Sequence, residues 1–316
     1  MNDSEKVLES SIPRVQFFKG SNYLALPRDP QPWIIEKFIP TGGAVNIYAK
    51  PKIGKSYLAL GIAHAINDPS VDEYLGCRVL KHGPVCYLQI DTPREEWASR
   101  IATMRTYAYI DDIHFTDRMM VPFPFDIVNP LIADGLKEAL DTIRPVALIV
   151  DTLREVHEED ENDSTGMKKV ISSLVKATKD INCTLILISH SRKDFQNKFG
   201  AGDDNIMDDG RGSSYVPGKM DVICKMTPCH VIMKGRAITE RRIAVEQLPE
   251  GHPQEGRIIL DSEKAENEAN IKYVLAQEHL KTKKAQHEML ATMEDIDVET
   301  AKSRIRRYKE KHSIKD

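Results

Sequence analysis

A polar segment between residues 49 and 56, AKPKIGKS, combines the residue types that hold phosphate groups. Such a loop needs backbone N–H groups that point inward, a lysine that reaches the β and γ phosphates, and a hydroxyl for the magnesium ion. Lys55 and Ser56 supply the last two, and Gly54 gives the backbone its freedom just before a helix. The segment therefore predicts a site for ATP and Mg²⁺ with these cofactor-binding residues: Ala49, Lys50, Pro51, Lys52, Ile53, Gly54, Lys55, Ser56 and Tyr57.

The first position of this segment departs from the usual phosphate-loop pattern, because Ala49 stands where a glycine is expected. A methyl group is tolerated there when the backbone dihedrals stay in allowed regions. Degenerate matches to the pattern also arise by chance, so the surrounding elements must decide. The context that would confirm the site is a strand directly before the loop and a helix directly after it.

Three further residues with useful chemistry each follow an apolar, strand-like run. Asp151 ends VALIVD, where its carboxylate could hold magnesium together with Ser56. Asp91 ends VCYLQID and could orient or deprotonate an attacking water molecule. His190 ends LILISH and could sense the γ phosphate. For each residue the alternative is a structural role at the end of a strand, such as capping the next turn.

The elements that would position these residues alternate along the chain. Four runs are nearly continuous in apolar and β-branched residues, as strands buried on both faces are: 44–48, 83–91, 146–153 and 183–190. Helical patterns follow the first three runs in SYLALGIAHAI, PREEWASRIATMRTYA and TGMKKVISSLVKATKD. This order predicts an α/β fold with a mainly parallel central sheet and helices on both faces. DVICKM, HVIMKGR and RRIAVEQL are expected to be antiparallel strands that close the sheet.

The chain is expected to have three parts. Residues 1–28 lack a clear period and are interpreted as an extended N-terminal arm. Residues 29–250 form the predicted core, and PEGHPQEGR near 249–257 marks a break after it. Residues 251–316 are predicted to be a small helical module, with helices over 263–292 and 297–311, the second capped by Asp297.

Composition limits the classes of protein that fit. The 316 residues are 41% hydrophobic and 29% charged, as in ordinary globular proteins. No apolar run approaches the roughly 20 residues of a membrane helix, and the N-terminus has acids where a signal peptide is basic and then apolar. We therefore expect a cytoplasmic protein without membrane contact. The five cysteines lack metal-ligand spacing and are expected to be buried free thiols. A net charge of −4 means that any nucleic-acid binding must be local.

Six motifs occur in a fixed order: GGAVNIYAKPKIGKSYLAL, YLQID, LIVDTL, LILISHSRK, RGSS and KGR. Together with PWIIEKFIPTGG ahead of the first strand, this order resembles the RecA-like P-loop ATPases of the RepA and DnaB hexameric replicative helicase type. The resemblance covers roughly residues 32–248. It implies the roles given above for Lys55, Ser56, Asp151 and His190. Asp91 falls where these proteins usually have glutamate, which is longer by one methylene group.

The resemblance also implies partners. Family members act as rings, often hexameric, with ATP between subunits and basic fingers donated by the neighbour, and Lys234 and Arg236 of MKGR match the place of those fingers. Added positive charge at the γ phosphate agrees with the demands of phosphoryl transfer. The alternative for these two residues is a solvated strand end.

Segment 191–214 would then face the central channel of the ring. There, Arg192, Lys193 and Lys198 could follow the backbone of single-stranded DNA, although several aspartates dilute the positive charge of the segment. The alternative is a plain surface loop. A primase or a replication loader would be a further partner of such a ring.

The C-terminal end carries a dense basic cluster, with six lysines and arginines between residues 302 and 311. This cluster fits a helix-turn-helix or winged-helix module, in which Arg304 and Arg307 are candidate DNA contacts. The alternative is a solvated helix that takes part in ring assembly.

These features favour a DNA-dependent ATPase that acts as a replicative helicase or translocase of plasmid or phage type. Its predicted catalytic residues are Lys55, Asp91, Asp151, His190 and Arg236. Two alternatives stay open. One is a RecA-like recombinase or mediator that forms filaments. The other is a nucleotide-regulated DNA-binding loader or regulator with slow hydrolysis, which Ala49 and Asp91 favour.

Overall fold

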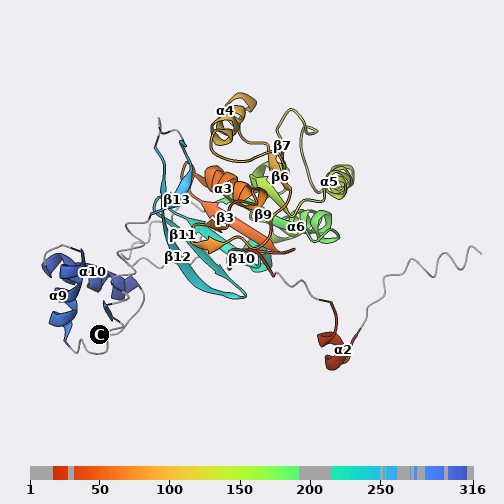
Figure 1. Ribbon diagram of the computed structural model, residues 1–316. Coiled ribbons are helices and arrows are strands. Elements are labelled where there is room, and N and C mark those ends of the chain that lie inside the picture. Colours follow the sequence, from red (N-terminus) through yellow and green to blue (C-terminus); the bar gives the residue numbers. More distant parts are fainter. Residues whose placement is uncertain are drawn as a thin grey trace, which may run out of the picture. The chain divides into compact units, whose positions relative to one another are not determined.

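The computed structural model in Figure 1 describes residues 17–27, 32–191, 215–249, 252, 254–261, 271, 274–275, 282–294 and 298–311. The chain divides into two units, Met1–Pro32 and Trp33–Asp316. In the first unit, the described residues form one short helix, α2 (Gly20–Leu24), which buries none of its side chains. The predicted extended arm therefore contains a helical turn, and the aromatic side chains of Phe17 and Tyr23 are exposed.

A nine-stranded sheet forms the centre of the second unit, in the order β13-β12-β11-β10-β3-β9-β8-β6-β7. Six neighbouring strands, from β10 to β7, run parallel, and β11, β12 and β13 continue the sheet in antiparallel pairs. The predicted α/β fold with a mainly parallel sheet is confirmed. The strands are β3 (Ala44–Ala49), β6 (Val85–Gln89), β7 (Ile113–Thr116), β8 (Ala147–Asp151), β9 (Thr184–His190), β10 (Val222–Met226), β11 (His230–Gly235), β12 (Ile238–Gln247) and β13 (Ile258–Leu260).

Two short hairpins lie outside this sheet. They pair β1 (Trp33–Ile35) with β2 (Ile39–Pro40), and β4 (Glu73–Tyr74) with β5 (Cys77–Arg78). Ile34, Ile35, Phe38 and Ile39 from the first hairpin belong to the same buried cluster as the central strands. The segment PWIIEKFIP therefore packs as part of the core.

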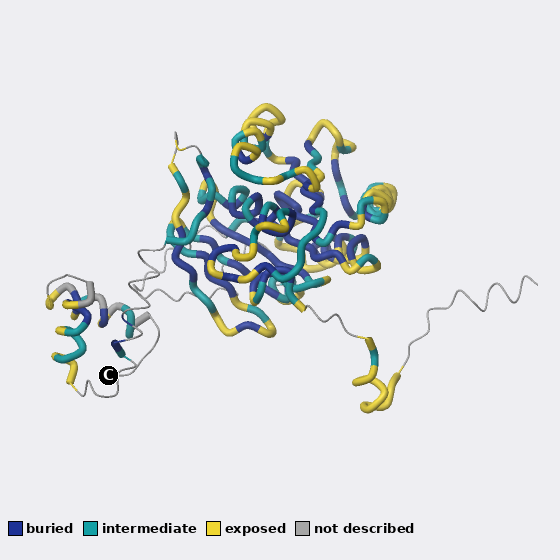
Figure 2. The backbone as a smooth tube through the Cα atoms, viewed as in Figure 1, coloured by how far each residue is buried: buried dark blue, intermediate teal, exposed yellow. Residues whose placement is uncertain are grey.

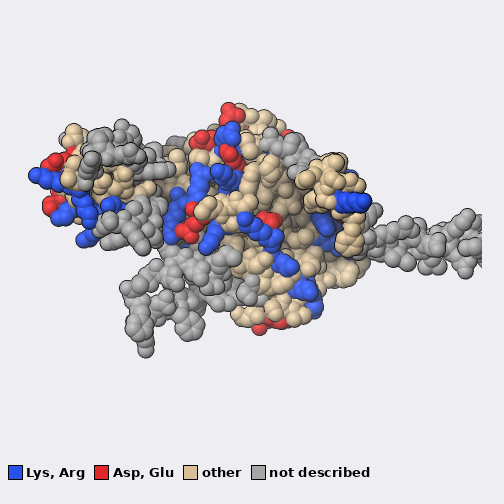
Figure 3. Space-filling view, turned by 90° about the horizontal axis from the view of Figure 1, so that it is seen from below, with Lys and Arg blue, Asp and Glu red and all other residues tan. Residues whose placement is uncertain are grey.

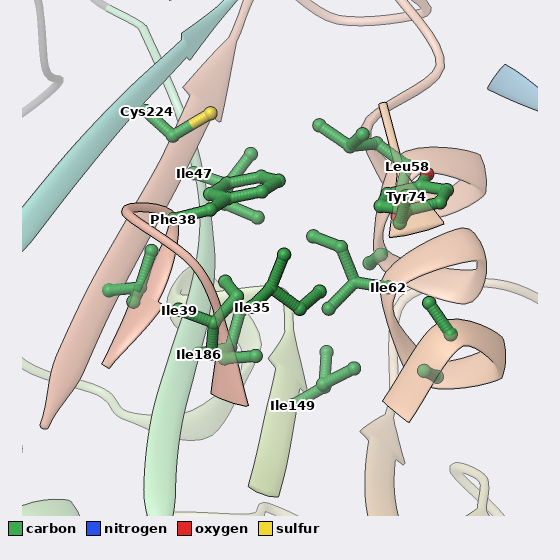
Figure 4. Close-up of a cluster of buried hydrophobic side chains, with 14 of the residues drawn as sticks. Ile35, Phe38, Ile39, Ile47, Leu58, Ile62, Tyr74, Ile149, Ile186 and Cys224 are labelled. Carbon is green, nitrogen blue, oxygen red and sulfur yellow. The ribbon is translucent and has the colours of Figure 1, made fainter. Parts of the chain in front are cut away.

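Helices cover both faces of the sheet because the side chains of each buried strand alternate between two apolar clusters. In β8, Ile149 belongs to the cluster that includes α3 (Lys55–Asn67) and α4 (Arg94–Arg105). The flanking Leu148 and Val150 belong to the cluster that includes α5 (Pro130–Ile143) and α6 (Ser164–Lys179). Figure 4 shows Ile149 and Ile186 directed toward Ile62 of α3. The burial colouring in Figure 2 follows this division, with dark strands inside and exposed outer helix surfaces.

Local signals fix where two of these helices begin. The Asp163 carboxylate accepts hydrogen bonds from the N–H groups of Thr165 and Gly166 at the start of α6. Asn129 caps α5 in the same way, and Pro130 occupies its first position. Two shorter elements complete the unit: the 3₁₀ helix η1 (Leu153–Val156) and α7 (Tyr215–Lys219).

The sheet differs from the expectation in three strands. DVICKM is antiparallel to HVIMKGR, as expected, because β10 forms an antiparallel pair with β11, but β10 also pairs with β3 in parallel, with Val222 opposite Val45. An apolar pattern reports burial but carries no information on strand direction. β7 and β13 were not expected from the sequence, and β13 extends the sheet beyond residue 250. PEGHPQEGR is not a break but the connection of a hairpin, in which the N–H of Leu248 donates to the carbonyl of Arg257 (2.9 Å).

The described C-terminal residues include α9 (Lys283–Glu294) and α10 (Val298–Lys311). They have an apolar cluster of their own, which contains Leu290 and Ala291 from α9 and Ala301 and Ile305 from α10. A helix over 297–311 is thus confirmed to within one residue, while Asp297 lies outside the described residues. Across the part of the chain that the structure describes, every helix is too short or too polar to cross a membrane. Four of the five cysteines are buried free thiols, as expected, and Cys229 is partly exposed.

Candidate active site

Residues 50–54 connect β3 to α3 in a tight loop. Lys52 (φ +63°) and Gly54 (φ +91°) have left-handed backbone conformations, and Gly54 directly precedes the helix. The positive φ of Gly54 favours glycine, and a Cβ atom there would lie 2.6 Å from Oε1 of Gln247, so any larger residue would also displace the Gln247 side chain. Left-handed residues in a turn gather backbone N–H groups into an anion-binding concavity, and the positive end of α3 adds to it. The strand, loop and helix that a phosphate loop needs are all present.

The side chain of Lys55 is buried although it carries a charge. Its Nζ donates to the carbonyl oxygens of Ala49 (3.4 Å) and Lys50 (3.2 Å), and it lies 3.4 Å from Nδ1 of His190. Burial lowers the pKa of Lys55, and the carboxylates of Asp151 and Asp91 act in the opposite direction. These nearest partners are neutral atoms, so a phosphate oxygen would be a stronger partner for the ammonium group than any of them.

The Asp151 carboxyl group is almost fully buried at the end of β8. The hydroxyl of Tyr87 donates to its Oδ2 at 2.8 Å. Burial raises the pKa of Asp151, whereas hydrogen bonds from Ser56 and Tyr87 and the charge of Lys55 lower it. Tyr87 is itself fully buried, and its pKa lies well above the usual value because of burial and the nearby Asp151. The hydroxyl, the carboxyl and the ammonium group therefore form one coupled polar cluster.

The sheet register explains why these residues meet. Ala49 pairs with His190, and Asp151 pairs with both Ile188 and Gln89, so β3, β9, β8 and β6 all end at the same edge of the sheet. Asp91 follows two residues after the end of β6 and is exposed. The carboxyl ends of parallel strands are where α/β proteins place their ligands.

A cleft of about 500 Å³ opens at this edge. It contains most of the residues predicted from the sequence together with four that the sequence did not indicate, namely Thr92, Arg100, Thr152 and Gln247. The full lining is Pro51, Lys52, Gly54, Lys55, Ser56, Tyr57, Asp91, Thr92, Arg100, Asp151, Thr152, His190 and Gln247. One cleft thus holds a phosphate loop, two carboxylates and a histidine.

Comparison with known proteins agrees with a phosphate-binding cleft of this kind. A protein-family model described as an AAA domain matches residues 10–196, which is more than half of the chain. The chain belongs to this AAA-domain family. It is also similar in fold to a solved structure described as a DnaB-like replicative helicase and its interactions with primase, with a TM-score of 0.50 and 14% sequence identity. That match covers 76% of this chain and 66% of the helicase chain.

This AAA-domain chain therefore has the RecA-like α/β fold that the motifs predicted. It spans about two thirds of the length of the helicase that it resembles.

ATP and Mg²⁺ fit the residues present in this AAA-domain core. The concave loop and the Lys55 ammonium group are suited to phosphate oxygens, and the Ser56 hydroxyl and the Asp151 carboxylate are oxygen ligands of the kind that magnesium prefers. Family membership implies the use of a nucleotide, usually with magnesium. Three residues of the predicted segment do not line the cleft: Ala49 is buried in β3, Ile53 packs against the core, and the exposed Lys50 contributes its carbonyl to Lys55.

The two predicted finger residues lie at the opposite edge of the sheet. Lys234 is near the end of β11, and Arg236 lies in the turn that leads into β12. In register, Gly235 pairs with Val222, and Val222 pairs with Val45 near the start of β3. Neither basic residue lines the cleft of its own chain.

The predicted DNA contacts are only partly placed. Arg192, Lys193, Lys198 and the RGSS motif lie outside the described residues. Arg304 and Arg307 lie within α10, on the helix whose Ala301 and Ile305 belong to the C-terminal cluster.

Strand alternation could have revealed Tyr87, because it lies two residues before Gln89 on the face shared with Asp151. Arg100 and Gln247 could not have been found this way. Gln247 reaches the loop only because β12 joins the sheet through β11 and β10, and β10 pairs with β3, which is far away in the sequence.

Proposed function

We propose that this protein is an ATP-hydrolysing, DNA-dependent motor that works as an oligomeric ring, in the manner of a replicative helicase or translocase of plasmid or phage type. The observation that carries the proposal is the single cleft in which Lys55, Ser56, Asp151, Asp91 and His190 meet. These residue types are the ones that phosphoryl transfer to water requires.

Each side chain has a role that follows from its position. The Lys55 ammonium group, which donates to the carbonyl groups of Ala49 and Lys50, brings positive charge close to the β and γ phosphates. Ser56 and Asp151 would hold the magnesium ion, whose chemistry when bound is to neutralise charge on the phosphates. Asp91, exposed at the mouth of the cleft, orients or deprotonates the attacking water. His190 lies beside Lys55 and senses whether the γ phosphate is present.

The active site is completed by a second subunit in this proposal. Arg236 lies at the far edge of its own sheet from its own cleft, so it can meet a nucleotide only on another copy of the chain. A finger of this kind stabilises the charge that develops on the transferred phosphate. Lys234, two residues earlier on the same hairpin, would enter with it.

DNA is the proposed track of the motor. Arg192, Lys193 and Lys198 in the channel segment, and Arg304 and Arg307 on α10, are the proposed backbone contacts. Figure 3 supports local binding, because basic side chains spread over the face shown despite the net negative charge of the chain. A primase is a proposed partner because the similar helicase structure is described with primase.

One observation favours a second function, a nucleotide-regulated DNA-binding loader or regulator. Asp91 is shorter by one methylene group than the glutamate expected there, and its exposed position leaves a water molecule less confined. Slow hydrolysis that DNA does not stimulate would support this reading. A filament-forming recombinase stays the other alternative, and strand pairing without unwinding of a forked duplex would support it.

The direct test measures phosphate release by the full chain with Mg²⁺ and ATP, with and without single-stranded DNA. We expect DNA to increase turnover, and Lys55→Ala to abolish it in both conditions. Lys176→Ala is the matched control, because Lys176 is an exposed lysine on α6, on the other face of the sheet. Lys55→Ala with full DNA-stimulated hydrolysis would show that the site is wrongly assigned.

A further inference from the structure

The carboxylate of Asp221 has two separate partners at the amino edge of the sheet. Its Oδ2 accepts the N–H of Ala44, the first residue of β3, at 2.9 Å. Its Oδ1 lies 3.6 Å from Nη1 of Arg236. The backbones are joined as well, because the N–H of Asp221 donates to the carbonyl of Ala44 (2.8 Å) and the N–H of Arg236 donates to the carbonyl of Asp221 (3.1 Å).

Space around this carboxylate is limited, so its position is well defined. A Cβ atom at Gly43 would lie 2.8 Å from Oδ2 of Asp221, and one at Gly235 would lie 2.3 Å from the carbonyl oxygen of Asp221. Two glycines therefore let the start of β3 and the β11–β12 turn approach Asp221 from two directions. The position of Asp221 is therefore set by its backbone contacts, independently of Arg236.

Arg236 is held on a second side by α7. Its Nη2 donates to the carbonyl of Gly218 at 3.4 Å. Both contacts are long, and the side chain of Arg236 keeps 66% of its accessible surface, against 39% for Asp221. An exposed ion pair of this kind contributes little to stability, so the pair orients the guanidinium group without binding it strongly.

We propose that Asp221 is a positioning residue for Arg236, which it aims away from its own subunit and toward the phosphate groups bound by a neighbouring copy. This inference rests on the proposed function, in which Arg236 acts on the neighbour's nucleotide. The two contacts fix the direction of the guanidinium fork, and their weakness lets the arginine exchange Asp221 for a phosphate oxygen. A charged group that is oriented in advance loses less conformational freedom in the transition state.

The Asp221→Asn variant separates the effect of Asp221 on the orientation of Arg236 from its effect on the fold. The asparagine side chain has the same shape, and its carbonyl oxygen can still accept the N–H of Ala44, so β3 keeps its start while the charge that faces Arg236 is lost. Asp221→Ser is the second variant, a smaller polar side chain that also lacks the charge, and thermal unfolding reports whether its loss of reach disturbs the start of β3. Glu240→Gln is the matched control, because Glu240 on β12 is a carboxylate of similar exposure (34% against 39%) that is paired with a different arginine, Arg242 (3.0 Å).

The experiment is a double-mutant cycle in DNA-stimulated ATP hydrolysis by the assembled full-length protein, using Asp221→Asn, Arg236→Ala and the combined variant. We expect Asp221→Asn to lower kcat about tenfold with little change in KM, and to have no further effect in the Arg236→Ala background. Asp221→Ser should behave in the same way, Glu240→Gln should keep full activity, and thermal unfolding of all variants should stay close to that of the parent.

The outcomes distinguish the two levels of the proposal. If Arg236→Ala keeps full activity, the finger in the proposed function is wrong. If Arg236→Ala loses activity while Asp221→Asn keeps it, or lowers it by the same factor in both backgrounds, the positioning role is wrong and the finger stands. If both uncharged variants unfold or lower kcat only in proportion to lost stability, Asp221 has a structural role alone, and the inference is also overturned.

Discussion

The two edges of the parallel sheet carry charged groups in opposite ways. At the carboxyl edge, Lys55 and Asp151 are buried, and their partners come from their own chain. At the amino edge, Arg236 is largely exposed and has two long contacts. A buried charge keeps its place only when the fold surrounds it with partners, so the carboxyl edge is complete in geometry within one chain. Holding the exposed Arg236 side chain in one conformation costs conformational entropy, which a contact with another molecule would offset.

The largest expected effect comes from removing Arg236 at the amino edge of the sheet. Arg236→Ala should lower DNA-stimulated kcat about 1000-fold, within the range found for arginine fingers, with nucleotide affinity nearly unchanged. Mixing Arg236→Ala with Lys55→Ala subunits sharpens the test, because a mixed ring contains interfaces with an intact cleft facing an intact finger. Partial recovery of phosphate release on mixing is expected. If no recovery occurs while mixed rings form, then Arg236 does not act between subunits.

The function proposed for the carboxyl edge is tested most directly by a substitution of Asp151. Asp151→Asn keeps the shape of the side chain but removes the negative charge proposed to hold magnesium, so we expect hydrolysis to fall by about 100-fold or more. Titration with Mg²⁺ should show that the loss is not recovered at high metal concentration. Unchanged turnover at low Mg²⁺ would argue against the metal role.

A smaller change tests the support of that carboxylate. Tyr87→Phe removes only the hydroxyl that donates to Oδ2 of Asp151. Loss of such a supporting hydrogen bond typically weakens metal binding by a factor of 10 to 100, and we expect about tenfold in the Mg²⁺ concentration for half-maximal hydrolysis. Tyr109→Phe, on a tyrosine outside the cleft, is the control. An equal effect of both variants would contradict the specific role of Tyr87.

The smallest expected effect is on stability, and it has the opposite sign to the effect on activity. Burial raises the pKa of Asp151 above its ordinary value, so the folded protein loses stability as pH rises above the ordinary aspartate range, and the cost remains at neutral pH. Without nucleotide, Asp151→Asn should therefore raise Tm at pH 7 by about 2–4 °C per kcal/mol of relieved cost. The gain should shrink below about pH 4, where the unfolded chain also holds the proton. Thermal unfolding at several pH values is the measurement, and a lower Tm at pH 7 would show that the hydrogen bonds of Asp151 outweigh its burial.

The sequence predicted the carboxyl edge much better than the rest of the molecule. Asp151 and His190 end buried strands, and Lys55 follows the loop after a third, and the apolar runs of these strands are visible in the sequence. Parallel strands bring such ends together. The direction of β10 depends on its pairing with the distant β3, which apolar periodicity does not encode, and β13 is too short to give a clear pattern of its own. Gln247 was missed for the same reason.

The amino edge shows the reverse situation. Arg236 was selected only through a resemblance, because a KGR turn has no chemical signature of its own. Asp221 gave no signal at all, since a single aspartate ahead of a strand is common. Its two-sided contact with Ala44 and Arg236 exists only after the hairpin has folded against β3.

Strand β3 joins the two edges, and this has a consequence for timing. Its six residues are all buried and pair with β9 on one side, and Val45 to Tyr48 also pair with β10 on the other, so the strand is a stiff element about 20 Å long. One end enters the phosphate loop, and the other end meets Asp221. In a closed ring of the proposed kind, β3 would connect the subunit's own phosphate loop to the Arg236 that contacts the nucleotide of the neighbouring subunit. Hydrolysis in one subunit would then be coupled to hydrolysis in the next, so the ring would show cooperativity in ATP that a free monomer lacks.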